Sequence, residues 1–454
     1  MGAFHAYDIR GIYNVDFDCD FAYKVGFFLP ELLNADKVLV GRDVRVSSDE
    51  IFQYLAEGIT DAGADVYNIG LATTPLVYFA TSKHDFPASV QITASHNPRE
   101  YNGMKVSRAK TIPVGLDTGL STIKEWIENG KPMVKSVKKG VIRDFDVKQE
   151  YLAFLKSYKS DISNLNVGMD ISNGMAALFV KDLFGEQPHY LFDELDGTFP
   201  NHEANPLVAK NIVDLQNLVK EKKCDIGVIF DGDADRVMFV DEKAHFISPD
   251  LMIALMGHYF FKDGRNKGAI VLQDIRSSKS VGEYLSRMGG KMATWRVGRA
   301  FAAPKLSELG GLYGGELAGH YYFRDFFYSD SGLLASLIIL DIVADFKRKG
   351  ITVSQAIDAI TKYRSSGEIN FKIEQKKEAM DAVRDYFSST ENVTAFYDFD
   401  GYRMEFPTWW FNIRPSNTEP YLRFICEAQT DEELAVKVAK VKEILSSCPG
   451  KSGE

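Results

Sequence analysis

Ser95 is the residue whose surroundings most directly indicate chemistry. It lies in the segment Thr93-Ala-Ser95-His96-Asn97-Pro98, directly after an apolar stretch that is typical of a strand. A turn at the end of a strand presents its hydroxyl outward, Asn97-Pro98 favours the turn, and His96 supplies a proton donor or acceptor. Ser95 could therefore be a nucleophile or a phosphate carrier. A plain polar turn is the alternative for this motif alone, which lacks the glycines of a hydrolase elbow.

A second loop carries three aspartates on alternate residues, Asp231, Asp233 and Asp235, followed by Arg236. Like charges at this spacing converge only around a positive group, so we expect a hard divalent cation between them. Magnesium suits three carboxylates that keep a position open for a phosphate oxygen. A solvated acidic turn is the ordinary alternative.

The same loop superficially resembles a calcium-binding EF-hand, because Asp231, Asp233, Asp235 and Glu242 fall at its positions 1, 3, 5 and 12. Two features argue against this interpretation. Arg236 occupies the sixth position, where the sharp turn needs glycine, and the flanking segments are typical of strands rather than helices. We therefore expect magnesium and not an EF-hand.

Two further loops could bind a sugar phosphate. In Gly314-Gly315-Glu316-Leu317-Ala318-Gly319-His320, glycines allow close approach of the backbone and a carboxylate suits paired hydroxyls, although a glycine-rich turn fits as well. The segment Arg414-Pro415-Ser416-Asn417-Thr418-Glu419-Pro420 supplies guanidinium, hydroxyl and amide donors for a phosphate, and Arg423 follows it. A surface turn with two prolines is the alternative for this last loop.

Several folding units must bring these loops together, because the loops are widely separated in the sequence. A chain of 454 residues exceeds the size at which one core keeps growing, so we expect three or four domains. Each loop then falls in a different domain, and four domains meet at one cleft.

Apolar runs alternate with amphipathic helices from residue 35 onward, which is typical of parallel α/β architecture. The expected strands are Lys37–Val40, Asp65–Ile69, Ser89–Thr93, Val167–Asp170, Asp225–Phe230, Ala269–Gln273 and Lys291–Trp295. The expected helices run through Gly58 from a capping box at Ser47–Glu50, around Ala176–Phe184, Asn211–Lys222 and Ala302–Leu309, after Ser277, and from near Ser331. After Ser365-Ser366-Gly367 the pattern becomes β-rich, with strands at Thr394–Tyr397 and Trp409–Ile413 and a closing helix from Thr430.

Composition excludes several classes of protein. The sequence is 45% hydrophobic and 26% charged, and it has no apolar run approaching the ~20 residues that span a bilayer. The polar N-terminus does not resemble a signal peptide, so we expect a cytoplasmic protein with no membrane partner. A net charge of −10 argues against a nucleic-acid partner. The scattered Cys19, Cys224, Cys426 and Cys448 indicate reduced thiols rather than a zinc site.

Together the motifs T-A-S-H-N-P, D-G-D-A-D-R, G-E-L-A-G-H and R-P-S-N-T, in this order, closely resemble those of the α-D-phosphohexomutase superfamily, and within it the phosphomannomutase/phosphoglucomutase group. The resemblance runs from Tyr7-Asp8-Ile9-Arg10-Gly11 to Arg423. It implies three similar mixed-sheet α/β domains and a C-terminal α+β domain of the TATA-box-binding-protein-like type around a central cleft. We place these domains at 1–145, 146–246, 247–362 and 363–454.

The resemblance also implies an activity. Such an enzyme interconverts hexose 6-phosphate and hexose 1-phosphate through a phosphoserine and a hexose 1,6-bisphosphate, which serves as intermediate and activator. By this resemblance Ser95 is the phosphoserine, and Asp231, Asp233 and Asp235 hold Mg²⁺ beside it. Most of the catalysis is then positioning and electrostatics, with charge on the phosphoryl group neutralised by the ion and by cationic side chains.

The resemblance assigns further roles around the reacting oxygens. Arg10 and Lys105 flank them, and Lys105 is the expected general acid/base, with a pKa lowered by surrounding positive charge. His96 lies close to the reacting groups. Glu316 binds sugar O3 and O4. The other expected substrate-binding residues are Tyr7, Arg236, Arg299, Ala318, His320, Arg414, Ser416, Asn417, Thr418 and Arg423.

Two positions depart from the pattern of many relatives. Ala318 replaces a serine, so one hydrogen bond to the sugar would be lost. Arg299, in Val297-Gly298-Arg299-Ala300, replaces a histidine and could still reach a phosphate. The segment His320–Asp325 and the following Ser329–Gly332 resemble phosphomannomutases more than phosphoglucosamine mutases, so we expect a preference for mannose.

Other functions stay open on the sequence alone. A phosphoglucomutase or a dual glucose/mannose enzyme is the first alternative, because both hexose 1-phosphates fit one contact of the Glu316 type. A phosphoserine-based sugar phosphatase and an inactive sugar-phosphate sensor are the others. The expected partner is the hexose phosphate itself, and the protein is expected to be a monomer or a homodimer.

Overall fold

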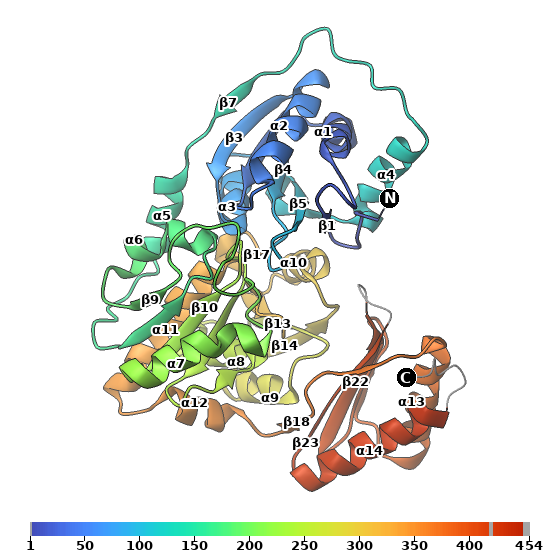
Figure 1. Ribbon diagram of the computed structural model, residues 1–454. Helices are drawn as coiled ribbons and strands as arrows, with labels where there is room; N and C mark the ends of the chain where they lie inside the picture. The colour runs from blue at the N-terminus through green and yellow to red at the C-terminus, as the bar shows by residue number, and fades with distance from the viewer. Residues whose placement is uncertain (1, 417–420, 448–454) are drawn as a thin grey trace.

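The computed structural model describes residues 2–416 and 421–447, in which four β-sheets follow one another along the chain (Figure 1). The first three sheets are mixed, and the fourth is antiparallel throughout. In Figure 1 the C-terminal sheet and its helices, coloured orange to red, form a separate lobe at the lower right. The predicted change of architecture after the third α/β unit is therefore present.

The first sheet has the strand order β1-β5-β4-β2-β3-β7, with β6 paired to β5. Its strands are β1 (Ile9–Ile12), β2 (Lys37–Arg42), β3 (Asp65–Leu71), β4 (Ala88–Ile92), β5 (Tyr101–Arg108), β6 (Pro113–Val114) and β7 (Ile142–Asp144). Its helices are α1 (Cys19–Leu33), α2 (Ser48–Asp61), α3 (Thr74–Lys83) and α4 (Leu120–Glu128). Because β2 and β4 are parallel neighbours with Arg42 opposite Ile92, the loops that follow both strands lie together.

The second sheet has the order β12-β11-β10-β8-β9 and the third β14-β13-β15-β16-β17. Their strands are β8 (Val167–Asp170), β9 (His189–Leu191), β10 (Ile226–Phe230), β11 (Val237–Asp241), β12 (Phe246–Ile247), β13 (Ile270–Asp274), β14 (Lys291–Trp295), β15 (Tyr313–Gly315), β16 (Tyr321–Phe323) and β17 (Ser329–Asp330). Their helices are α5 (Lys148–Lys156), α6 (Val180–Phe184), α7 (Val213–Lys222), α8 (Pro249–Phe260), α9 (Lys279–Arg287), α10 (Arg299–Glu308), α11 (Gly332–Arg348) and α12 (Val353–Ile360).

The fourth sheet has the order β18-β23-β22-β21-β20, and β19 also pairs with β23. Its strands are β18 (Arg364–Ser365), β19 (Ile369–Phe371), β20 (Ala395–Tyr397), β21 (Tyr402–Glu405), β22 (Trp409–Pro415) and β23 (Leu422–Ala428), with helices α13 (Lys376–Thr390) and α14 (Asp431–Ser447). Each sheet falls inside one of the four predicted domains, apart from β12, which runs one residue past 246. The boundaries themselves remain our proposal.

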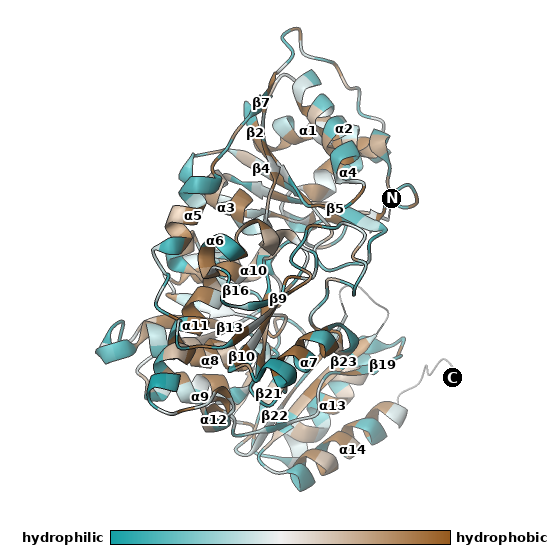
Figure 2. Ribbon diagram, turned by 60° about the vertical axis from the view of Figure 1, so that its left-hand side comes forward, coloured by the Kyte–Doolittle hydropathy of each residue, from teal (hydrophilic) through white to brown (hydrophobic). Residues whose placement is uncertain are grey.

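One hydrophobic core joins the second and third sheets. Buried side chains of β8, β10, β11, α8 and α11 belong to a single cluster, which also includes residues 76–80 of α3 from the first domain. Figure 2 shows hydrophobic residues concentrated where these elements pack. The first domain and the C-terminal domain each have a separate core. Loops of the second and third domains are thus held in one packed body.

Two local predictions need correction. The capping box expected at Ser47–Glu50 is wrong, because the Ser47 hydroxyl accepts a hydrogen bond from Asn102 Nδ2 (2.8 Å) and does not cap α2. The helices expected around Ala176–Phe184 and Asn211–Lys222 each begin as a 3₁₀ turn, at Met175–Leu178 and Ala209–Ile212, before α6 and α7.

Candidate active site

The Ser95 loop leaves the end of β4 in a strained conformation. Ser95 has φ 51°, in the left-handed region that residues with a side chain seldom adopt, and it is only 3% exposed. Its amide donates a hydrogen bond to Thr93 Oγ1 (2.8 Å), and His96 Nδ1 lies 3.3 Å from Ser95 Oγ. The hydroxyl is therefore held in one direction by the backbone, as expected for a reactive serine.

Ser95 meets the aspartate loop, which connects β10 to β11. Ser95 Oγ donates a hydrogen bond to Asp231 Oδ2 at 2.8 Å, although 136 positions separate the two residues. A side chain at Gly232 would prevent this contact, since its Cβ would lie 2.5 Å from the Ser95 carbonyl oxygen. The sequence motifs predicted that both loops belong to one site, and the structure brings the two loops into contact.

The three aspartates fit a divalent cation. Asp231, Asp233 and Asp235 are at most 1% exposed, and one carboxylate oxygen from each lies within 4.8 Å of the others. In the described part of the chain, Asp233 Oδ1 and Asp235 Oδ1 are buried without a hydrogen-bond partner. Burial and the charges of the other two carboxylates raise the pKa of Asp231 well above its usual value. Carboxylate oxygens and a serine oxygen are hard ligands of the kind magnesium prefers.

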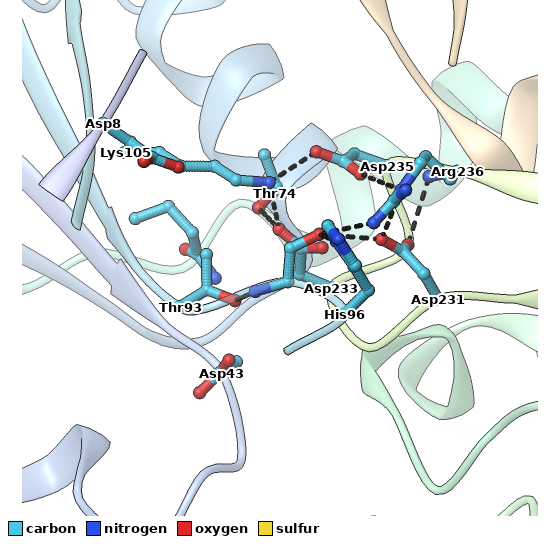
Figure 3. A network of polar contacts seen from close by, with 12 residues as sticks. Asp8, Asp43, Thr74, Thr93, His96, Lys105, Asp231, Asp233, Asp235 and Arg236 are labelled. Atoms are coloured by element: carbon cyan, nitrogen blue, oxygen red, sulfur yellow. Dashed lines mark hydrogen bonds and ion pairs between the residues drawn. The ribbon is translucent and has the colours of Figure 1, made fainter. Parts of the chain in front are cut away.

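Lys105 reaches this cluster from β5. Its Nζ donates to Asp233 Oδ2 (2.6 Å) and Asp235 Oδ2 (2.5 Å), and Thr74 Oγ1 donates to the same oxygen of Asp233 (Figure 3). Burial disfavours the charged lysine, but the two carboxylates outweigh it and raise the pKa of Lys105 well above its ordinary value. The expected lowering of this pKa is therefore wrong in this arrangement, because the nearest charges are negative.

Two arginines border the serine and the aspartates. Arg236 Nε donates to Asp231 Oδ2 (3.0 Å), and its Nη2 lies 3.4 Å from Ser95 Oγ (Figure 3). Burial, together with the nearby charge of Arg10, lowers the pKa of Arg236 to about 9. Arg10, from β1, donates to Asn97 Oδ1 (2.8 Å) and pairs with Asp8. Both guanidinium groups therefore lie beside the Ser95 loop, where a phosphoryl group would need positive charge.

Glu316 lies at the end of β15 and is 1% exposed. It accepts hydrogen bonds from Tyr322 Oη at Oε1 (2.5 Å) and from the Gly298 amide at Oε2 (3.1 Å). Ala318 follows in the same loop and is half-buried. Tyr7 comes from the first domain, and its hydroxyl donates to the Val297 carbonyl (3.3 Å). The predicted sugar loop thus contacts Gly298, and the neighbouring Val297 contacts Tyr7 of the first domain.

His320 links the sugar loop to the aspartates. Its Nδ1 lies 2.6 Å from Asp330 Oδ2 and 3.8 Å from Asp235 Oδ1. Burial opposes the charged ring, but Asp235 and Asp330 outweigh it and raise the pKa of His320. The backbone of Val237 also donates to Gly319 O (3.3 Å). The second and third domains are therefore joined directly at the site.

Arg299 begins α10 and extends toward the first domain. Its Nε donates to Asp330 Oδ1 (3.0 Å), its Nη2 donates to the Thr111 carbonyl (3.0 Å), and its guanidinium lies 3.7 Å from the Tyr78 ring centroid. These contacts connect the first and third domains. To bind a phosphate, as predicted, Arg299 would have to give up one of these contacts and donate to the phosphate in its place.

Arg414 lies at the end of β22 and is 4% exposed. Among the described residues its Nε and Nη1 have no hydrogen-bond partner, and Asp400 Oδ1 lies 3.8 Å from Nη1. Burial and the charge of Arg276 lower the pKa of Arg414. Among the described residues, Arg414 therefore keeps buried donors that could bind a phosphate, while Arg276 pairs with Asp274 (2.8 Å) and adds positive charge nearby.

The rest of the predicted phosphate loop is only partly described. The Ser416 amide donates to Tyr421 O (2.9 Å), and Arg423 pairs with Glu368 (3.1 Å). Asn417 and Thr418 lie outside the described residues. Their predicted contacts with phosphate remain predictions.

Several residues at the site were not found from the sequence. Thr74 and Arg45 contact the aspartate and serine loops, and Arg276 accompanies Arg414. Asp400 accepts from the Val297 amide (2.9 Å) and so joins the C-terminal domain to the third. The available signal was their position: Arg45, Thr74 and Arg276 each follow a strand at the edge where parallel sheets bind ligands.

The described part of the chain contains no helix that is long and apolar enough to cross a membrane.

Models of one protein family cover most of the sequence. Those described as phosphoglucomutase/phosphomannomutase alpha/beta/alpha domains I, II and III match residues 1–133, 149–244 and 248–363, and the model of the C-terminal domain matches 368–444. The matches follow one another in the order that the motifs predict.

Individual proteins agree with this result. The chain is 35% identical to a phosphomannomutase of Escherichia coli, covering 98% of this chain and 99% of the relative. It is 37% identical to a phosphomannomutase of Vibrio cholerae, covering 98% and 97%. A crystal structure of a phosphoglucomutase/phosphomannomutase family protein from Burkholderia thailandensis superposes with a TM-score of 0.85 at 27% identity, over 98% of this chain and 97% of that one. The predicted family and fold class are confirmed, and the chain belongs to the phosphoglucomutase/phosphomannomutase family.

Proposed function

We propose that the protein is a hexose phosphate mutase that interconverts hexose 6-phosphate and hexose 1-phosphate, with mannose as the preferred sugar and Ser95 as the phosphoryl carrier. The observation that carries the proposal is the 2.8 Å contact between Ser95 Oγ and Asp231 Oδ2, which puts a strained, buried hydroxyl beside three carboxylates. The names of the curated relatives support the mutase activity and the mannose preference. A glucose-specific or dual enzyme is the alternative.

In the proposed reaction, two phosphoryl transfers occur in opposite directions. In the first, the bond between phosphorus and Ser95 Oγ breaks, a bond to the free sugar hydroxyl forms, and the hydroxyl proton passes to Ser95 Oγ. The hexose 1,6-bisphosphate then turns and returns its other phosphoryl group to Ser95, with the proton moving the opposite way. Lys105 is proposed to carry this proton, since a protonated lysine can donate a proton to the serine oxygen and the neutral amine that results can take up the proton of the sugar hydroxyl.

Magnesium is the proposed cofactor. Asp231, Asp233 and Asp235, together with Ser95, would hold it, and their buried carboxylate oxygens support this assignment. When bound, the ion supplies positive charge to the phosphoryl group. Arg10 and Arg236 supply further positive charge from the protein side.

The C-terminal domain is proposed to bind the phosphate that does not react. Arg414 supports this role with buried donors, and Ser416, Asn417, Thr418 and Arg423 complete the proposed set. Glu316, with His320, Tyr7, Arg299 and Ala318 around it, is proposed to contact the sugar or its phosphate. The bisphosphate must release one phosphate to turn, which a separate C-terminal domain permits.

Lys105→Ala is expected to lower kcat by ~10²–10⁴-fold, the range for a lost general acid/base. Steady-state kinetics with a hexose 1-phosphate and a bisphosphate activator measure this change. Lys105→Arg is the matched variant, because it keeps the positive charge beside Asp233 and Asp235 while arginine does not give up its proton. If both variants keep a rate near that of the wild type, Lys105 does not transfer the proton.

Sugar preference is tested by assaying mannose 1-phosphate and glucose 1-phosphate separately, each with its own 1,6-bisphosphate. We expect kcat/KM to be higher for mannose 1-phosphate, because the relatives with 33–37% identity carry that name. The two sugars differ only in the orientation of the C2 hydroxyl, and a site that hydrogen-bonds this hydroxyl can distinguish them by roughly 10²-fold or more. A value for mannose about 10²-fold below that for glucose would make the protein a phosphoglucomutase. Release of inorganic phosphate as fast as isomerisation would instead indicate a phosphatase.

A further inference from the structure

Arg45 is a buried arginine whose donors all face the serine loop and its neighbour Asp43. It follows β2, and its side chain is 0% exposed. Its Nη2 donates to the carbonyl oxygens of Ser95 (2.9 Å) and Asn97 (2.7 Å). Its Nη1 donates to those of Pro98 (2.7 Å) and Tyr101 (3.0 Å). One guanidinium thus binds four main-chain carbonyls of a seven-residue segment.

The position of Arg45 is itself fixed. Its Nε donates to Asp43 Oδ2 (3.2 Å), and the other oxygen of Asp43 accepts from the Arg45 amide (3.0 Å) and from Ser48 Oγ (2.6 Å). Asn102, which lies in β5 directly after the serine loop, donates to Ser48 Oγ (3.0 Å). This contact connects the Asp43 and Ser48 side chains to the strand that follows the loop. The planar guanidinium, with its five N–H donors, matches these carboxylate and carbonyl acceptors, and no other side chain could replace it.

A loop of the second domain also packs against the guanidinium. The Phe199 ring centroid lies 5.0 Å from it, and Gly197 packs so closely on residues 44 and 45 that a Cβ there would lie 2.1 Å from the Val44 carbonyl oxygen. Arg45 therefore lies between the serine loop of one domain and a loop of the next. Such burial of a charged group is costly for stability alone, so a role in fixing geometry is the better explanation.

The serine loop needs external support. The left-handed conformation is unfavourable for a residue with a side chain, and Ser95 adopts it at φ 51°. The Ser95 carbonyl is directed to Arg45, while its hydroxyl is directed to Asp231. Holding the carbonyl therefore sets the direction in which the hydroxyl points.

We infer that Arg45 is a positioning residue for phosphoryl transfer, which acts through the backbone of residues 95–101 and does not itself touch the substrate. The inference rests on the proposed function, since it assumes that Ser95 carries the phosphoryl group. Loss of Arg45 lets the loop relax from its strained conformation, and the hydroxyl leaves its place beside the aspartates. A displacement of about 1 Å is enough to lower a transfer rate ~10²-fold.

The test compares Arg45→Lys and Arg45→Met with Leu55→Ala in the full-length protein. Lysine keeps the charge but cannot bind four carbonyls at once, and methionine removes all donors. Leu55 is fully buried in α2, so its replacement destabilises the same domain without removing a contact to the serine loop. The measurements are the thermal midpoint, kcat and KM, the rate at which a hexose 1,6-bisphosphate phosphorylates Ser95, and amide hydrogen exchange in residues 94–102.

We expect Arg45→Lys to lower kcat by ~10–10²-fold with KM within about threefold, and Arg45→Met to lower it further. Phosphorylation of Ser95 slows in parallel, and exchange in 94–102 increases. Leu55→Ala lowers the thermal midpoint but leaves kcat and exchange in 94–102 near the wild type below that midpoint. If Arg45→Met does not fold, Arg45→Lys gives the result alone.

Wild-type kcat and wild-type exchange in folded Arg45→Lys would overturn the inference, as would equal losses in Arg45→Lys and Leu55→Ala at matched stability. A different result would show that the proposed function itself is wrong. In that case the wild-type protein neither isomerises hexose phosphates nor acquires phosphate on Ser95. The exchange measurement still decides whether Arg45 orders the loop.

Discussion

Ser95→Ala is expected to abolish mutase activity, with a loss of roughly 10⁴–10⁶-fold, the range for removal of a group that forms a covalent intermediate. Without Oγ there is no phosphoryl donor for the first transfer and no acceptor for the second. The hydroxyl makes few structural contacts, chiefly with Asp231 and His96, so the variant is expected to fold. A coupled assay measures the rate, and intact mass before and after incubation with a hexose 1,6-bisphosphate measures phosphate on the protein.

Ser172→Ala is a matched control for this prediction. Ser172 is also a buried serine with positive φ, 54°, and its hydroxyl donates to the Phe230 carbonyl (2.7 Å) just before the aspartate loop. Its loss is expected to change activity less than about tenfold, as for one structural hydrogen bond of about 1 kcal/mol. Unchanged turnover in Ser95→Ala would exclude a phosphoserine mechanism. A wild-type protein that never acquires phosphate would indicate an inactive sugar-phosphate sensor.

Removal of divalent metal with EDTA is expected to reduce turnover by roughly 10³-fold or more, since a bound ion supplies several kcal/mol of charge stabilisation in the transition state. Added Mg²⁺ should restore it. A metal held by the folded aspartate loop would not bind the unfolded chain, so Mg²⁺ at about 100 times its Kd should stabilise the stripped protein by about 2.7 kcal/mol and raise its thermal midpoint. This shift is measured without substrate.

Asp233→Asn distinguishes metal binding at the predicted site from binding elsewhere. It removes one carboxylate of the triad, so the thermal shift with Mg²⁺ should decrease strongly. Asp61→Asn is the control, because Asp61 is a buried carboxylate at the C-terminal end of α2 and pairs with Lys135 and Lys139. Full activity in chelator, or an unchanged shift in Asp233→Asn, would contradict the assignment of the metal.

The family resemblance of the sequence motifs was sufficient to predict which loops meet. Ser95 and Asp231 each follow a strand, but β4 and β10 belong to different sheets, so the contact between them was implied by the resemblance and not by spacing alone. The pKa of Lys105 could not be inferred. It depends on Asp233 and Asp235, which belong to another domain, and their distance from Nζ is set by how the domains pack.

Arg45 and Arg299 show a second limit of the sequence. Arg45 makes its contacts through carbonyl oxygens, which every residue carries, so no pattern of side chains indicates them. Arg299 appeared to be a substitute for histidine, yet its partners Thr111 and Tyr78 come from a distant part of the chain. Interactions of this kind are visible only when the three-dimensional arrangement is known.

The continuous core of the second and third domains has a consequence for substitutions that disturb its packing. A cavity made in α11, for example at Ile338, would loosen the aspartate loop and the Glu316 loop at the same time, because both rest on the same packed interior. Substitutions in the interior of the C-terminal lobe, for example at Phe411, would spare both loops and weaken only the proposed binding of the phosphate that does not react. Variants of this protein should therefore fall into two kinetic groups according to which interior they disturb.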